Sequence, residues 1–122
     1  MQTTTLEMTR HASHRSAQRR PPAHVMEVLR SGGGTDFPCG HPAFRGVTLR
    51  VVRTSDEYWI AAHRAGDLIT LYRKTEDELD AWAWTYLLHP EQNRHRLRHL
   101  PVTKSPEEAV TEELLTKWVL TA

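Results

Sequence analysis

The chain has 122 residues, of which 39% are hydrophobic and 25% are charged, and this length suits one domain rather than two. The formal net charge of +1, from 16 basic and 15 acidic side chains, argues against a surface built entirely for nucleic acid. The single cysteine, Cys39, excludes an intrachain disulfide and therefore a disulfide-stabilised secreted scaffold. The sequence contains no apolar run of membrane-spanning length and no signal-peptide core, so we expect a cytoplasmic protein that does not contact membranes.

Residues 1–22 are polar and basic, and they end in a pair of prolines. Little in this segment would repay the entropy of ordering it, so we predict a flexible basic N-terminal arm. Residues 23–122 are predicted to form a single α+β domain. It begins with a short helix over residues 23–31, ended by the glycines at 32–34, and continues with a turn-rich loop over residues 35–45.

Three short segments with alternating apolar residues follow, at 46–53, 57–64 and 67–74. This pattern predicts a three-stranded antiparallel meander. One face of the meander is expected to form a core and carries Val47, Leu49, Val51, Tyr58, Ile60, Ala62, Ile69 and Leu71. The other face is mixed and carries Thr48, Arg50, Val52, Trp59, Ala61, His63, Leu68, Thr70 and Tyr72.

Helices are predicted after the meander, which gives the order helix-β-β-β-helix-helix. Thr75 and Glu78 have the spacing of a capping box at the start of a helix over residues 75–89. Pro90 is expected to stop or kink this helix, and residues 91–100 have the composition of a further turn or two. Ser105 and Pro106 then begin a final helix, whose apolar residues are expected to cover the remaining apolar surface or to pair with a second subunit.

A metal site is one candidate for function. Cys39 and His41 are separated by one residue, and His95 and His99 have the spacing that places two imidazoles on the same helix face. One thiolate and three imidazoles would complete a tetrahedral zinc site. The competing interpretation, which we favour, is a buried cysteine in a loop and two surface histidines. No other cofactor is indicated.

A nucleic-acid surface is a second candidate, because basic residues concentrate in two parts of the chain. The residues concerned are Arg15, Arg19 and Arg20 in the arm, Arg50 on the mixed sheet face, and Arg94, Arg96 and Arg98 in the basic segment 94–104. Clustered arginines contact phosphates, and exposed rings such as Trp59 and Tyr72 would stack on bases. The alternative is that a helix, with the C-terminal one as the better candidate, covers this face and makes both rings part of the core.

A protein interface is the third candidate. Trp84 and Leu88 lie off the main apolar stripe of their helix, and Trp118 lies near the chain end on a helix with a strong apolar face. Tryptophan is enriched at interface hot spots, and small domains often complete their burial by dimerising. The alternative is that all four tryptophans are internal.

Enzymatic interpretations find little support, since the sequence has no phosphate-binding glycine motif and no nucleophile elbow. We therefore expect a small non-catalytic regulatory or adaptor protein that acts through protein-protein contacts, as a homodimer or with another protein. The interface residues would be Trp84, Leu88 and Trp118. The alternative is a nucleic-acid-binding protein that uses the arm and the 94–104 segment.

Overall fold

The computed structural model describes the backbone of residues 7–8 and 19–121 and the side chains of residues 19–117. Its elements, in chain order, are β1 (Glu7–Met8), α2 (Ala23–Arg30), β2 (Thr35–Pro38), β3 (Thr48–Arg53), β4 (Glu57–Arg64), β5 (Asp67–Thr75), α3 (Glu76–Tyr86), α4 (Pro90–Arg98) and α5 (Pro106–Thr121). The fold is mixed α+β, as the sequence predicts. The strands form one sheet in the order β1-β5-β4-β3-β2.

The centre of the sheet is the predicted antiparallel meander of β3, β4 and β5. Two strands extend it. The turn-rich segment that follows α2 contains β2, which pairs antiparallel with β3. Proline is tolerated there because β2 is an edge strand and Pro38 is its last residue. At the other edge, β1 pairs in parallel with β5, so part of the predicted flexible arm belongs to the sheet.

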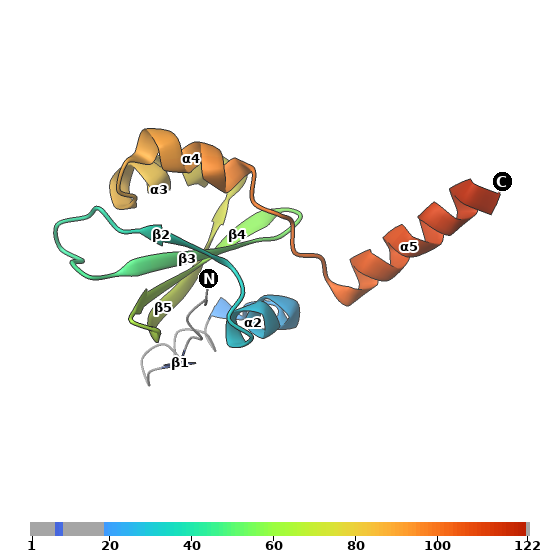
Figure 1. Ribbon diagram of the computed structural model, residues 1–122, viewed down its shortest axis with the longest axis horizontal. Coiled ribbons are helices and arrows are strands. Elements are labelled where there is room, and N and C mark those ends of the chain that lie inside the picture. Colours follow the sequence, from blue (N-terminus) through green and yellow to red (C-terminus); the bar gives the residue numbers. More distant parts are fainter. Residues whose placement is uncertain (1–6, 9–18, 122) are drawn as a thin grey trace.

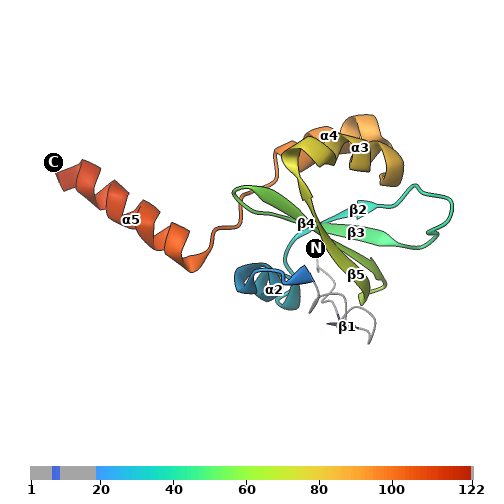
Figure 2. The same cartoon turned by 180° about the vertical axis from the view of Figure 1, so that it is seen from behind.

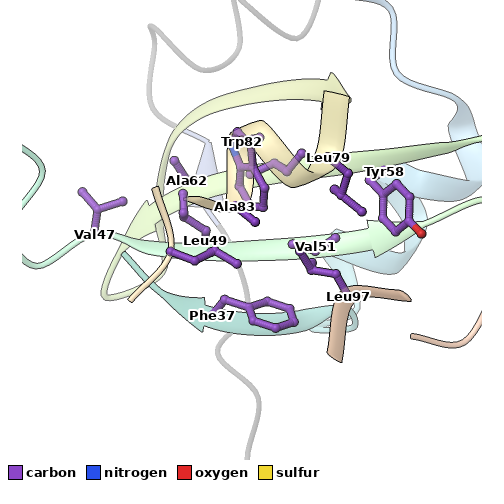
Figure 3. Packing of buried hydrophobic residues seen from close by; sticks show 12 residues of the cluster. Phe37, Val47, Leu49, Val51, Tyr58, Ala62, Leu79, Trp82, Ala83 and Leu97 are labelled. Atoms are coloured by element: carbon purple, nitrogen blue, oxygen red, sulfur yellow. The ribbon is translucent and has the colours of Figure 1, made fainter. Parts of the chain in front are cut away.

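The first sheet face carries the larger core, which α3 and α4 cover (Figures 1 and 2). As predicted, the stripe of α3 packs on this face through its buried residues Leu79, Trp82 and Ala83. Figure 3 shows these side chains between Val47 at one end of the cluster and Tyr58 at the other. The capping box is also present, since the Thr75 N–H donates to Glu78 Oε1 at 3.1 Å.

The second face is covered by α2 rather than by the C-terminal helix that the sequence favoured (Figures 1 and 2). Val25 and Leu29 of α2 pack against a second buried cluster of Val52, Trp59, Ala61, Leu68 and Leu71. Trp59 is therefore a core residue, as the alternative interpretation proposed.

The sequence assigned Leu71 and Tyr72 to the wrong faces. Leu71 belongs to the cluster on the second face, and Tyr72 packs on the first. The cause is a register shift next to Ala62 and His63, where β4 pairs with Thr70 and then with Leu68. The extra residue, Ile69, reverses the alternation of β5 beyond it.

The helices after the meander differ from the prediction in the boundary between α3 and α4 and in where α5 lies. α3 ends at Tyr86, and His89 adopts a left-handed conformation (φ 49°), so Pro90 begins α4 instead of ending α3. α5 begins as predicted, because Ser105 and Glu108 exchange hydrogen bonds between each side chain and the other's backbone N–H. Beyond this start, α5 extends away from the sheet (Figure 1). Within the described part of the chain, no helix is both long and apolar enough to cross a bilayer.

Candidate functional site

The most exposed large apolar side chains in the described part of the molecule lie on α5. Val110, Leu114 and Leu115 are 54%, 59% and 62% exposed. Leu114 follows Val110 by one turn, so these two share one side of the helix. Leu115 is turned about 100° from Leu114 and lies on the side of Thr111 and Glu108. Exposed apolar side chains that gather on one element are typical of interaction sites.

The start of α5 is attached to the sheet. The Thr103 N–H donates to the Arg53 carbonyl oxygen at 2.7 Å, and the Ser55 hydroxyl donates to the Glu108 carboxylate. The Ser55 hydrogen bond, and then those from Ser105, hold the pKa of Glu108 below its ordinary value. These contacts set the direction in which α5 leaves the domain, while its apolar residues remain free of the core.

Trp84 is exposed, as its position off the main stripe of α3 predicts, and Leu88, which lies beyond the end of α3, is exposed as well. Their exposed fractions are 50% and 43%. The Arg94 guanidinium lies over the Trp84 ring, 5.7 Å from its centre, and the ring remains half exposed. The side chain of Trp118, the third predicted interface residue, lies outside the described side chains.

The arginines of the basic segment contact acidic, polar and aromatic groups of their own chain. Arg98 forms ion pairs with Asp80, at 2.9 Å, and with Glu76. These pairs lower the pKa of Asp80 and raise that of Arg98. Arg96 donates to Asn93 Oδ1 at 3.0 Å and lies over another aromatic ring, that of Phe37, at 4.7 Å. A phosphate would have to compete with these groups for the same cations.

The remaining predicted nucleic-acid residues are dispersed. Arg50 is fully buried, so a phosphate on the surface does not reach it. Arg19 donates to the Leu71 carbonyl oxygen at 2.6 Å and to Thr70 Oγ1 at 3.2 Å. Arg20, the next residue, has a positive φ of 52°. Arg15 lies outside the described residues.

The predicted zinc ligands are not brought into one group. The backbone of Cys39 forms an antiparallel β-bridge with Leu87, just after α3. His95 and His99, in contrast, belong to α4 and its C-cap. His41 stacks on Tyr86, with 5.5 Å between ring centres. Across the described residues, no three side chains of histidine, cysteine, aspartate or glutamate lie together as a metal site would require.

A charge cluster made of the buried Arg50 and His63 and the partly exposed Asp36 joins β2 to the meander. Arg50 makes two parallel hydrogen bonds with the Asp36 carboxylate, at 2.8 and 2.9 Å. His63 Nε2 lies 3.1 Å from the same carboxylate, and His63 Nδ1 accepts a hydrogen bond from the Gly66 N–H. Since Nδ1 accepts, the ring proton is on Nε2 and points to Asp36. The sequence placed Arg50 and His63 on one face but missed Asp36, because it did not predict β2.

Burial would by itself raise the pKa of Asp36, but the hydrogen bonds from Arg50 and His63 outweigh this effect and leave the pKa below its ordinary value. The carboxylate is therefore ionised at neutral pH. It neutralises the Arg50 charge inside the sheet and anchors the edge strand, which is a structural role.

Comparison with known proteins adds no relative. No protein-family model matches the chain, and no curated protein or solved structure is significantly similar to it.

Proposed function

We propose that this is a small non-catalytic regulatory or adaptor protein that acts through protein-protein contacts and self-associates through α5. The observation that supports the proposal is the exposure of Val110, Leu114 and Leu115 on a helix that extends from the domain (Figure 1). Single helices of this length are marginal in water, and most helices gain their stability by packing an apolar face. Pairing with another chain would bury these side chains and stabilise the helix.

The charges on α5 favour an antiparallel pair. Four glutamates, at 107, 108, 112 and 113, lie in its first half, and Lys117 lies beyond them. A parallel pair would place the acidic halves side by side, where like charges repel. In an antiparallel pair the acidic half of one helix faces Lys117 and the C-terminal half of the other.

Trp84 and Leu88 offer a second contact on the body of the domain. A large aromatic ring that is half exposed and held by a neighbouring arginine loses little conformational entropy on binding, which suits an interface anchor. The proposal assigns these residues to the recognition of a partner protein. Trp118 is assigned to the α5 contact from its position in the sequence.

The test is light scattering coupled to size-exclusion chromatography over a range of protein concentrations. We expect the unmodified chain to elute with the mass of two chains, with little dependence on salt. The double variant Leu114→Ala/Leu115→Ala should elute as one chain, and any loss of helix content should be confined to α5, because alanine preserves helix propensity but the unpaired helix loses its packing. The control is Thr116→Ala, an exposed polar position on the same helix, which should remain dimeric.

A monomer at all concentrations, or a dimer that the double variant leaves intact, would contradict self-association through α5. The same columns run with a mixed DNA and RNA pool examine the nucleic-acid alternative. Co-migration at low salt that disappears at high salt would favour that alternative, because phosphate contacts release counterions.

A further inference from the structure

A largely apolar cavity of about 340 Å³ opens on the first sheet face. Its floor is formed by Val47, Leu49, Ala62 and Ile69, and its walls include Phe44 and Tyr86. Figure 3 shows Val47, Leu49 and Ala62 at one end of the core, and Tyr58 and Leu97 at the opposite end. The volume and the apolar lining are those of a pocket for a small organic ligand.

A second and more open cavity, of about 600 Å³, adjoins the first and is cationic. The two share Tyr72 and Tyr86 as walls, and the second is also lined by Arg19, Arg73 and Lys74. Lys74 Nζ and the Arg19 guanidinium carbon lie 5.9 and 5.8 Å from the centre of the Tyr72 ring. The inner cavity is therefore lined mainly by apolar and aromatic side chains, with Arg64 and Thr70 among them, whereas the outer cavity is lined by cations; the two cavities meet at Tyr72.

The Tyr72 hydroxyl can donate a hydrogen bond to a ligand. Trp82 Nε1–H donates to its oxygen at 2.8 Å, which leaves the hydroxyl proton for another acceptor. Burial raises the pKa of Tyr72 to about 12, so the proton stays in place at neutral pH. A hydroxyl that accepts one hydrogen bond is a stronger donor of the next.

We propose that the two cavities form one binding site for a small amphipathic carboxylate. The apolar body of the ligand occupies the inner cavity over Leu49 and Ile69. Its carboxylate accepts a hydrogen bond from Tyr72 and lies among the cations of the outer cavity. The charges decide the class of ligand, because a cationic head group would be repelled at the same position. The proposal is independent of α5 and of self-association.

The first experiment is calorimetric titration of the full chain with decanoate below its micelle concentration. Decanol and decyltrimethylammonium serve as ligands with the same chain and a neutral or a positive head group. We expect one decanoate per chain, about tenfold weaker binding of decanol because a charged hydrogen bond is lost, and no saturable binding of the cation. Absence of saturation by decanoate up to about 1 mM, or equal binding of the three ligands, would overturn the proposal.

Two variants locate the bound molecule. Tyr72→Phe keeps the ring and removes the donor, so decanoate should bind about tenfold more weakly. Tyr58→Phe is the matched control, since Tyr58 packs on the same sheet face but donates to Glu76 and lines neither cavity. Ala43→Trp fills the inner cavity from an exposed loop position and should abolish binding.

The lone thiol gives a readout that needs no variant. Cys39 lines the inner cavity and is the only cysteine, so alkylation by iodoacetamide reports on this position alone. Saturating decanoate should slow the alkylation of Cys39 at least severalfold, and decyltrimethylammonium should not. An alkylation rate that decanoate leaves unchanged would place the ligand elsewhere and overturn the assignment.

Discussion

Arg50, which is fully buried, meets the Asp36 carboxylate through two parallel hydrogen bonds, although the Asp36 side chain is 36% exposed. The two residues lie directly opposite each other in the β2–β3 register. A guanidinium inside a sheet is tolerated only where a carboxylate compensates it, so the pair ties β2 to the meander. The contribution of this ion pair to the free energy of unfolding can be measured directly by mutation.

Asp36→Asn should lower the free energy of unfolding by about 2 kcal/mol, because the Arg50 charge stays buried while its counter-charge is removed. The loss is smaller than for a fully enclosed pair, since solvent reaches the Asp36 side chain. Urea unfolding followed by tryptophan fluorescence measures it. Asp67→Asn, at an exposed position that begins β5, is the control and should change the free energy by less than about 0.5 kcal/mol.

The same pair predicts a dependence on pH. The pKa of Asp36 is lower in the folded chain than in the unfolded chain, so the ionised carboxylate stabilises the fold above about pH 4. This contribution is lost as the pH falls through the folded pKa. The difference in unfolding free energy between the unmodified chain and Asp36→Asn should therefore shrink between about pH 5 and pH 2. A difference that stays constant over this range would show that the carboxylate charge is not the stabilising group.

Gly34 and Gly46 form a matched pair for a backbone prediction. Both have a positive φ, 94° and 78°, in which a side chain is strained. A Cβ at Gly34 would also lie 2.8 Å from Arg50 Cγ and 3.3 Å from the Val51 carbonyl oxygen, whereas a Cβ at Gly46 would meet nothing within 4 Å. Gly46→Ala should cost about 1 kcal/mol of unfolding free energy, and Gly34→Ala should cost clearly more. Equal losses in thermal or urea unfolding would contradict the close contact with Arg50.

The parts of the fold that the sequence predicted are those with a local cause. Alternation within single strands gave the meander, and the residue pairs Thr75–Glu78 and Ser105–Pro106 marked two helix starts. Strand β2 was missed because the residues with which it pairs are distant from it in the sequence. Phe37 and Asp36 are held by Leu49 and Arg50, which no pattern within residues 35–45 reveals.

The candidate sites also divide into those that depend on local spacing and those that depend on contacts between distant segments. The exposure of Trp84 followed from its angular position on α3, which sequence spacing encodes, whereas Leu88 is exposed although α3 ends before it. The zinc hypothesis required a loop and a helix to meet, and spacing within each says nothing about that. The loop that carries Cys39 packs against the end of α3 instead, where the Gly40 N–H donates to the Tyr86 carbonyl oxygen at 2.8 Å.

Removal of α5 should separate folding from association. A chain that ends at Ser105 loses the hydrogen bond between Ser55 and Glu108, which is exposed and therefore contributes little to stability. Both core clusters consist of residues that precede α5, so the unfolding free energy should change by less than about 1 kcal/mol at protein concentrations where the unmodified chain is monomeric. Circular dichroism should lose only the helical signal of α5, and light scattering should give the mass of one chain.

A shortened chain that unfolds at much lower urea concentration, even where the unmodified chain is monomeric, would contradict this prediction, because it would mean that α5 packs on its own domain in solution. The variant Leu114→Ala/Leu115→Ala distinguishes the two cases without shortening the chain. If α5 packs on its own domain, the double variant loses stability at every protein concentration. If α5 pairs with a second copy, the loss appears only where the unmodified chain is dimeric, because association stabilises the folded state by mass action.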